Sequence, residues 1–225
     1  MPAFDAASSL DGAGASSFSW SHTCTGSNRW LQVAVGGQNG TSITTTSVTY
    51  NSVALTELWD IYFNSYIFGS MSHLANPASG ANTIAVTLSG GGNVTAGLAS
   101  SYTDVHQTTP VDTAATATGT QSDPTVNVSS ASGDLVVDAV SIADSAINVG
   151  AGQTSRAEFD GLSGGLWSGG ISEEAGAATV TMSWTRAGFT NNVDEWIIGG
   201  ISVNPPAAGG ATWPGWMWNK GGWTA

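Results

Sequence analysis

Carboxylates that are paired in the sequence are the first residues that could do chemistry. Three such pairs occur, namely Asp134 with Asp138, Glu173 with Glu174, and Asp194 with Glu195. Two carboxylates that face one sugar can serve as the acid and the base, or the nucleophile, of a glycosidase. Asp134 and Asp138 are an even number of residues apart, so a single strand would carry both on the same face.

Each carboxylate pair also has a structural interpretation. Asp134 follows Ser132-Gly133 and is typical of the turn that opens a strand. Asp138 interrupts an apolar strand, where we expect it to protect an exposed sheet edge from pairing with another sheet. The other two pairs are expected at solvated strand ends. A glycosidase is therefore the weakest of the functional hypotheses, and we predict that the protein is not an enzyme.

The candidate nucleophiles are a serine and the single cysteine. Residues 161–165 match the pattern Gly-x-Ser-x-Gly, with Ser163 at its centre. This pattern forms a nucleophile elbow only between a strand and a helix, whereas here we expect a Gly-rich turn between two strands. Cys24 has no evident acid–base partner and is expected to be a small buried side chain.

Histidines and loop aspartates are the candidate metal ligands. His22, His73 and His106 lie far apart, and none has the spacing of a zinc site. Four aspartates expected in loops could bind Ca²⁺: Asp104, Asp112, Asp123 and Asp160. The sequence contains no contiguous Asp-rich calcium loop. We therefore predict no metal and no cofactor.

Exposed aromatic side chains could bind a glycan by stacking on the faces of its sugars. The segment 58–68 is dense in aromatic residues and includes Tyr62 and Tyr66. Trp167 lies between two Gly-Gly pairs, where we expect a flexible loop. These three residues are the glycan-stacking candidates. The alternative, which strand aromatics favour, is an ordinary core with one subunit contact.

The C-terminus is unusually rich in tryptophan. Residues 205–211 contain Pro, Gly and Ala and predict a linker. Residues 212–225, the Trp-rich tail, hold the candidate docking residues Trp213, Trp216, Met217, Trp218 and Trp223. Because aromatic anchors dominate the energetics of interfaces, we expect this tail to dock onto a neighbouring subunit. Folding back over its own domain is the alternative.

The composition excludes several classes of partner. Only 9% of the residues are charged, and the net charge is -12. The four basic residues cannot neutralise the roughly six to ten phosphates of a DNA footprint, so we expect no nucleic acid. The acidic excess disfavours an anionic membrane surface. With 41% hydrophobic residues and ten tryptophans, the chain is not a disordered segment either.

Short strands must position these residues, because helix signals are nearly absent. Alternating or β-branched runs punctuated by Gly, Asn and Pro predict about a dozen strands. The predicted strands cover residues 17–22, 29–35, 42–50, 53–61, 65–74, 83–89, 95–104, 124–129, 134–142, 153–159, 166–173, 178–186 and 195–203. This spacing is typical of a β-sandwich or a barrel.

The two halves of the chain resemble each other. Residues 79–88 are similar to 175–184, and residues 30–35 are similar to 135–140. Two similar halves of four to six strands are what a jelly roll gives, although chance likeness between strands is the alternative. We therefore predict an all-β jelly-roll β-sandwich of two antiparallel sheets over residues 1–204, followed by the linker (205–211) and the tail (212–225).

Several strand and turn phrases also resemble a known group of proteins. The phrases cover residues 27–35, 47–56, 75–87, 132–140, 176–184 and 196–203. They are similar to jelly-roll domains of tailed-bacteriophage virion proteins, which also occur in bacterial surface proteins. The resemblance spans roughly residues 15–204 and implies a fold and a virion or surface setting. It carries over no catalytic residue, and the tail lies outside it.

These observations favour a non-enzymatic virion structural protein, either a capsid decoration protein or a subunit of a head or tail fibre. Its expected partners are other virion proteins and further copies of itself, and a trimer would fit. Because no export signal follows Met1, we expect it to be made in the host cytoplasm and released within the virion. An extracellular or cell-surface location is the alternative. The alternative functions are a carbohydrate-binding, receptor-recognising module and a bacterial surface-filament subunit.

Overall fold

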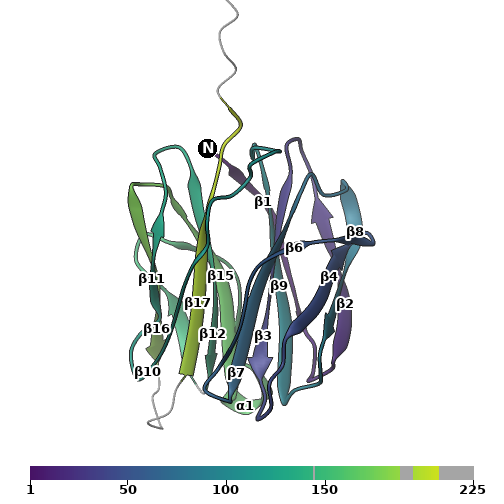
Figure 1. Cartoon of the computed structure of the whole chain (residues 1–225), viewed down its shortest axis with the longest axis vertical. Coiled ribbons are helices and arrows are strands. Elements are labelled where there is room, and N and C mark those ends of the chain that lie inside the picture. Colours follow the sequence, from purple (N-terminus) through teal and green to yellow (C-terminus); the bar gives the residue numbers. More distant parts are fainter. Residues whose placement is uncertain (144, 188–194, 208–225) are drawn as a thin grey trace, which may run out of the picture.

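The computed structural model describes residues 1–143, 145–187 and 195–207, and these residues form antiparallel sheets with almost no helix (Figure 1). The all-β class predicted from the sequence is thus confirmed. The sequence predicts two sheets, but the described residues form four. These sheets stack as an outer, an inner, a second inner and a second outer layer.

The first half of the chain supplies one inner and one outer sheet. The inner sheet has the order β1-β9-β3-β7-β6, with β1 (Ala3–Asp11), β9 (Val94–Thr103), β3 (Trp30–Gln38), β7 (Ile67–Ala75) and β6 (Thr56–Phe63). The outer sheet has the order β2-β8-β4-β5, with β2 (Ser17–Cys24), β8 (Gly80–Leu88), β4 (Thr45–Tyr50) and β5 (Val53–Ala54).

The second half supplies the other two layers. Its inner sheet has the order β10-β17-β12-β15-β14, with β10 (Ala115–Thr120), β17 (Glu195–Val203), β12 (Leu135–Ala143), β15 (Trp167–Ala175) and β14 (Thr154–Gly161). Its outer sheet has the order β11-β16-β13, with β11 (Thr125–Ser129), β16 (Thr179–Ala187) and β13 (Ala146–Val149). A single helical turn, α1 (Leu162–Gly165), joins β14 to β15.

The strand orders of the two halves correspond one to one. Inner strands β1, β9, β3, β7 and β6 match β10, β17, β12, β15 and β14, and outer strands β2, β8 and β4 match β11, β16 and β13. Only the two-residue strand β5 has no counterpart among the described residues. The similar sequence segments of the two halves fall on equivalent strands, β8 with β16 and β3 with β12. The chain is therefore an internal repeat of one sheet pair.

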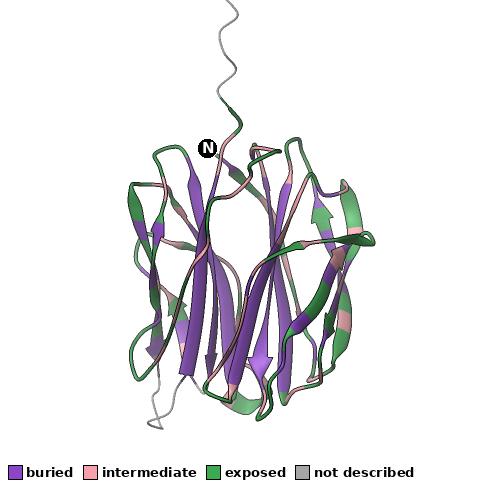
Figure 2. Ribbon diagram, in the orientation of Figure 1, coloured by how far each residue is buried: buried purple, intermediate pink, exposed green. Residues whose placement is uncertain are grey.

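Burial explains why four layers form. The central inner strands β3, β12 and β17 are buried along their whole length, so both of their faces need a cover (Figure 2). The outer strands alternate: in β2, Trp20, His22 and Cys24 are buried and the intervening Ser and Thr are exposed. A half-buried strand shows this period of two because successive side chains point to opposite faces.

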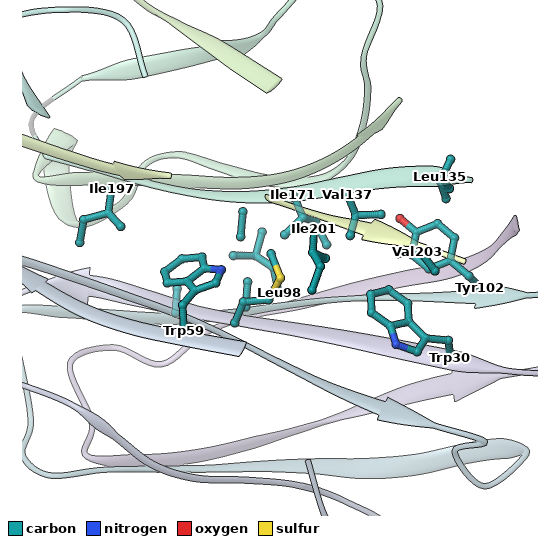
Figure 3. Packing of buried hydrophobic residues seen from close by; sticks show 14 of the residues in the cluster. Trp30, Trp59, Leu98, Tyr102, Leu135, Val137, Ile171, Ile197, Ile201 and Val203 are labelled. Carbon is teal, nitrogen blue, oxygen red and sulfur yellow. The ribbon is translucent and has the colours of Figure 1, made fainter. Parts of the chain in front are cut away.

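The two inner sheets pack against each other through a shared apolar core (Figure 3). Trp30, Trp59 and Leu98 come from the first half and meet Ile171 and Ile201 of the second. Trp59 lies so close to the facing sheet that a Cβ atom on Gly199 would overlap its indole. Burial of such large side chains is the main favourable term in folding, so the halves form one body rather than two separate domains.

Candidate functional site

Asp138 is the most buried of the described candidate carboxylates. It lies in the central strand β12 between β15 and β17, and its side chain is fully buried. Its Oδ1 accepts hydrogen bonds from the Ser172 backbone N–H at 2.9 Å and hydroxyl at 2.7 Å, and its Oδ2 accepts one from Trp184 Nε1 at 2.8 Å. Burial raises the pKa of Asp138 to about 6. The expectation that Asp138 protects a sheet edge is therefore wrong.

Asp134 does not join Asp138 in a catalytic pair. Its carboxylate accepts a hydrogen bond from the Ala131 backbone N–H, which closes the turn before β12, and another from the Ser202 hydroxyl of β17. Four residues along a strand span about 13 Å, since each rises about 3.3 Å. Glycosidase carboxyl groups lie at most about 9.5 Å apart. Asp134 lies just before β12 rather than within it, and each aspartate holds its own local structure.

Glu173 and Glu195 are buried, so the expectation of solvated strand ends is wrong for both. The Arg156 guanidinium of β14 donates to the Glu173 carboxylate of β15 and lies 3.9 Å from the ring centroid of Phe4 on β1. Burial and the nearby Glu173 carboxylate raise the pKa of Tyr102 on β9 well above its ordinary value. This cluster joins the two halves of the chain.

Glu195 forms a second polar link between the halves. Its Oε1 accepts a hydrogen bond at 2.8 Å from the side-chain amide of Asn64, in the turn between β6 and β7. Of the other predicted carboxylates, Glu174 is half-buried on β15, and Asp194 lies outside the described residues. Neither of the two fully described carboxylate pairs is therefore placed as facing groups at a surface.

Ser8 and His22 form a contact that no sequence pattern predicts. Ser8 Oγ lies 2.8 Å from His22 Nδ1 and accepts a hydrogen bond from Trp20 Nε1 at 3.0 Å. Burial lowers the pKa of His22 to about 4, which makes it a weak base at neutral pH. His22 Nε2 has no hydrogen-bond partner among the described residues, whereas a catalytic base needs a third group to orient it. These hydrogen bonds of Ser8 hold β1 against β2.

The other candidate nucleophiles and ligands are isolated. Ser163 lies exposed in α1, which returns at once into β15 and so lacks the helix of a nucleophile elbow. Cys24 is buried, as expected, and burial raises the pKa of its thiol. The described part of the chain contains no group of three or more His, Cys, Asp or Glu side chains that could hold a metal. It also has no helix long and apolar enough to span a membrane.

The glycan-stacking candidates are not placed together. Trp167 is fully buried at the start of β15 and donates from Nε1 to the Ser141 hydroxyl at 2.7 Å, so its expected loop position is wrong. Tyr62 and Tyr66 are half-buried and pack against two different cores, on the two sides of the first inner sheet. The Tyr62 hydroxyl also donates to the Asn39 carbonyl. They form no common platform.

The docking candidates of the Trp-rich tail lie outside the described residues. These are Trp213, Trp216, Met217, Trp218 and Trp223. The last described strand, β17, ends at Val203, and Asn204 is fixed by hydrogen bonds to the segment 109–112. Of the predicted linker 205–211, the structure describes residues 205–207.

The outer faces of the molecule are the extended surfaces that the fold creates. On the first outer sheet, Ser17, Ser19, Ser21, Thr83 and Thr87 are exposed. On the second, the exposed residues are Thr125, Asn127, Ser129, Thr179, Thr181, Thr185 and Asn148. The seven strands of these sheets contain a single charged residue, Arg186, which is buried. Each outer face is thus a neutral array of small hydroxyl and amide groups.

No family model, no curated protein and no solved structure matches the chain. The function must therefore be inferred from these surfaces and from the fold that holds them in place.

Proposed function

We propose that the protein is a non-catalytic structural component of a tailed-phage virion, a capsid decoration or fibre subunit that works by binding neighbouring subunits. Such a component needs a rigid body and surfaces suited to permanent contact. The four stacked sheets, with three apolar cores between them, supply the rigid body. A bacterial surface filament would place the same demands on the fold.

The strand pairing supports the jelly-roll part of this proposal. In the first half, β1 pairs with β9, β2 with β8, β3 with β7, and β4 with β5. Antiparallel pairs nested in this way, first strand with last, follow from rolling one long hairpin into two sheets. The second half repeats the pairs β10 with β17, β11 with β16, and β12 with β15. We infer two jelly rolls joined by their inner sheets.

The observation that carries the proposal is the placement of charge. Although the chain has sixteen acidic residues, the strands of its two outer sheets bear no exposed charged side chain among the described residues. A net charge of -12 makes copies of the chain repel one another unless the contact surfaces are neutral. Neutral faces allow close contacts that do not depend on salt, and the carboxylates elsewhere keep the free protein soluble.

The experiment compares the full chain with a chain that ends after Ala211, during assembly of the particle. The shortened chain retains every described strand, so it should fold with an unchanged melting temperature. We expect it to be missing from purified particles, because it lacks the aromatic anchors of the tail. Normal incorporation of the shortened chain would contradict docking through the tail.

Carbohydrate binding is the second candidate function. The half-buried Tyr62 and Tyr66 flank the exposed turn Asn64-Ser65, which would place an aromatic ring and the Ser65 side chain near a sugar bound there. An open hollow of about 290 Å³ also lies over β2 and β8, lined in part by Ser17, Ser19 and Thr87. Glycan-array signals that disappear in Tyr62→Ala and Tyr66→Ala would support this function, and an array without signals would exclude the sugars tested.

A further inference from the structure

The four edge strands of the two inner sheets differ in how they are protected. The first inner sheet ends in β1 and β6, and the second ends in β14 and β10. An edge strand exposes unpaired backbone N–H and C=O groups, which can pair with a strand of another chain. Proteins protect such edges with charged side chains and with bulges that twist the strand away.

Three of these four edges carry both kinds of protection. In β1 a bulge lies between Phe4 and Ala6, and the charged residues are Asp5 and Asp11. In β6 a bulge lies between Glu57 and Trp59, and the charged residues are Glu57 and Asp60. In β14 a bulge lies between Ser155 and Ala157, and the charged residues are Arg156, Glu158 and Asp160.

The fourth edge, β10, carries neither. Its sequence is Ala-Thr-Ala-Thr-Gly-Thr, without charge or proline, and its register with β17 runs unbroken from Ala115 to Thr120. Its threonines are exposed, and its alanines and glycine are half-buried. No strand in the described part of the chain pairs with its outer side. Its equivalent in the first half is β1, so the two halves differ in protection at the same position.

A buried donor lies over this edge strand. The Trp196 side chain of β17 packs on Gly119, where a Cβ atom would lie 3.1 Å from Trp196 Nε1. Trp196 is buried, yet its Nε1 has no hydrogen-bond partner among the described residues. Buried indole N–H groups normally find an acceptor, and the described residues supply none at this position.

We propose that β10 pairs antiparallel with β10 of a second copy of the chain across a two-fold axis. This pairing would join the sheet β10-β17-β12-β15-β14 of one copy to the same sheet of the other copy. Antiparallel partners that lie opposite each other share a face, so the exposed threonines of one copy would meet those of the other. Small side chains on both faces let the strands approach without clashes. Because the other edges are charged and bulged, self-pairing of β10 is favoured over head-to-tail contacts.

Charge also favours a second copy as the occupant. Two chains of net charge -12 can approach closely only where neither presents a carboxylate, and β10 meets this condition along its whole length. This inference rests on the proposed assembly role but adds a specific contact to it. It can fail while docking through the tail remains valid.

The test uses the full-length protein and a pair of matched lysine variants. Thr118→Lys places a cation on the exposed face of β10, and Thr87→Lys places the same charge on an exposed position of β8. Sedimentation velocity over micromolar to near-millimolar concentrations measures the dimer dissociation constant. We expect the wild type and Thr87→Lys to dimerise alike and Thr118→Lys to dimerise at least about tenfold more weakly, because like charges would face each other across the strand pair.

A second measurement locates the contact without any substitution. Amide hydrogen exchange in β10 of the wild type should slow as protein concentration rises, while exchange in β14 should not change. A wild type that stays monomeric over the whole range would overturn the proposal. So would a folded Thr118→Lys that dimerises as well as the wild type, or a dimer in which β10 exchange is independent of concentration. None of these three results would affect the experiment with the chain that ends after Ala211.

Discussion

Replacing Asp138 with valine tests whether a carboxylate buried in the second half sets the response of the protein to pH. The internal repeat supplies the replacement, because Val33 of β3 occupies the equivalent position. Val33 lies opposite Ser72 and Ala99, just as Asp138 lies opposite Ser172 and Gly200. Valine at this site therefore suits the same strand in the same sheet order.

The size of the effect follows from the pKa of Asp138. Burial raises this pKa from its ordinary value of 3.8 to about 6. This rise in the pKa of Asp138 corresponds to about 3 kcal/mol of tighter proton binding by the folded state. A raised pKa means that the folded state binds the proton more tightly than the unfolded state does. Protonation of Asp138 therefore stabilises the fold fully below about pH 4, and this stabilisation is lost as the pH rises through about 6.

The assay is urea unfolding followed by tryptophan fluorescence, at a series of pH values from 4 to 7. Other titrating groups are common to both proteins and cancel in the difference between wild type and Asp138→Val. Unpaired Ser172 and Trp184 donors add a cost of about 1–3 kcal/mol each to the variant, which does not vary with pH. We expect the stability advantage of the wild type to shrink by about 2 kcal/mol from pH 4 to pH 7, because the unfolded carboxylate is still partly ionised at pH 4. A difference that stays constant across this range would refute the reasoning.

Two further predictions concern packing and a second titrating group. Gly199→Ala should lower the free energy of unfolding by about 1–3 kcal/mol, because the added methyl group overlaps the Trp59 indole. Gly90→Ala, which meets no atom within 4 Å, is its control, and equal melting temperatures for the two variants would contradict this packing. The His22 ring should titrate by NMR at a pH near 4, and stability should fall as the pH drops from 6.5 toward that value. A midpoint near 6.5 would show that the ring is solvated rather than held beside Ser8.

The strands that the sequence predicts are those with large side chains at alternate positions. Residues 17–22 predict β2 because Phe18, Trp20 and His22 alternate with serines, and the structure buries the last two of these. The strands β1, β10 and β13 escaped prediction. They lie at sheet edges, and β1 and β10 have Ala, Ser or Thr at many of their half-buried positions. Small side chains give little hydrophobic periodicity, so edge strands are hard to recognise.

Two candidate residues were misplaced because their partners are distant in the sequence. The glycines after Trp167 predicted a loop, but Cβ atoms on Gly169 and Gly170 would overlap the indoles of Trp167 and Trp184, so these glycines make room for buried rings. The sequence around Asp138 predicts a sheet edge, yet the groups that donate to its carboxylate, on Ser172 and Trp184, are 34 and 46 residues away. Tertiary contacts of this kind have no local signal.

The number of layers also cannot be predicted from local sequence patterns. The apolar runs of β3 and β12 are typical of strands buried on both faces. Four layers follow only from the packing of the two repeated halves through their inner sheets, and no local pattern predicts that packing. The likeness between residues 30–35 and 135–140 is the trace of this repeat in the sequence, and it falls on the two central strands that face each other across the shared core.

The most direct test of a structural role in an assembly is amine cross-linking of the native particle. Lys220, within the Trp-rich tail, is the only lysine of the chain, so a lysine cross-link reports on that tail alone. Mass spectrometry should find Lys220 joined to peptides of neighbouring subunits in intact particles, and these links should vanish when the particles are dissociated. Links from Lys220 only to its own chain, or a protein absent from any particle, would contradict the proposed function.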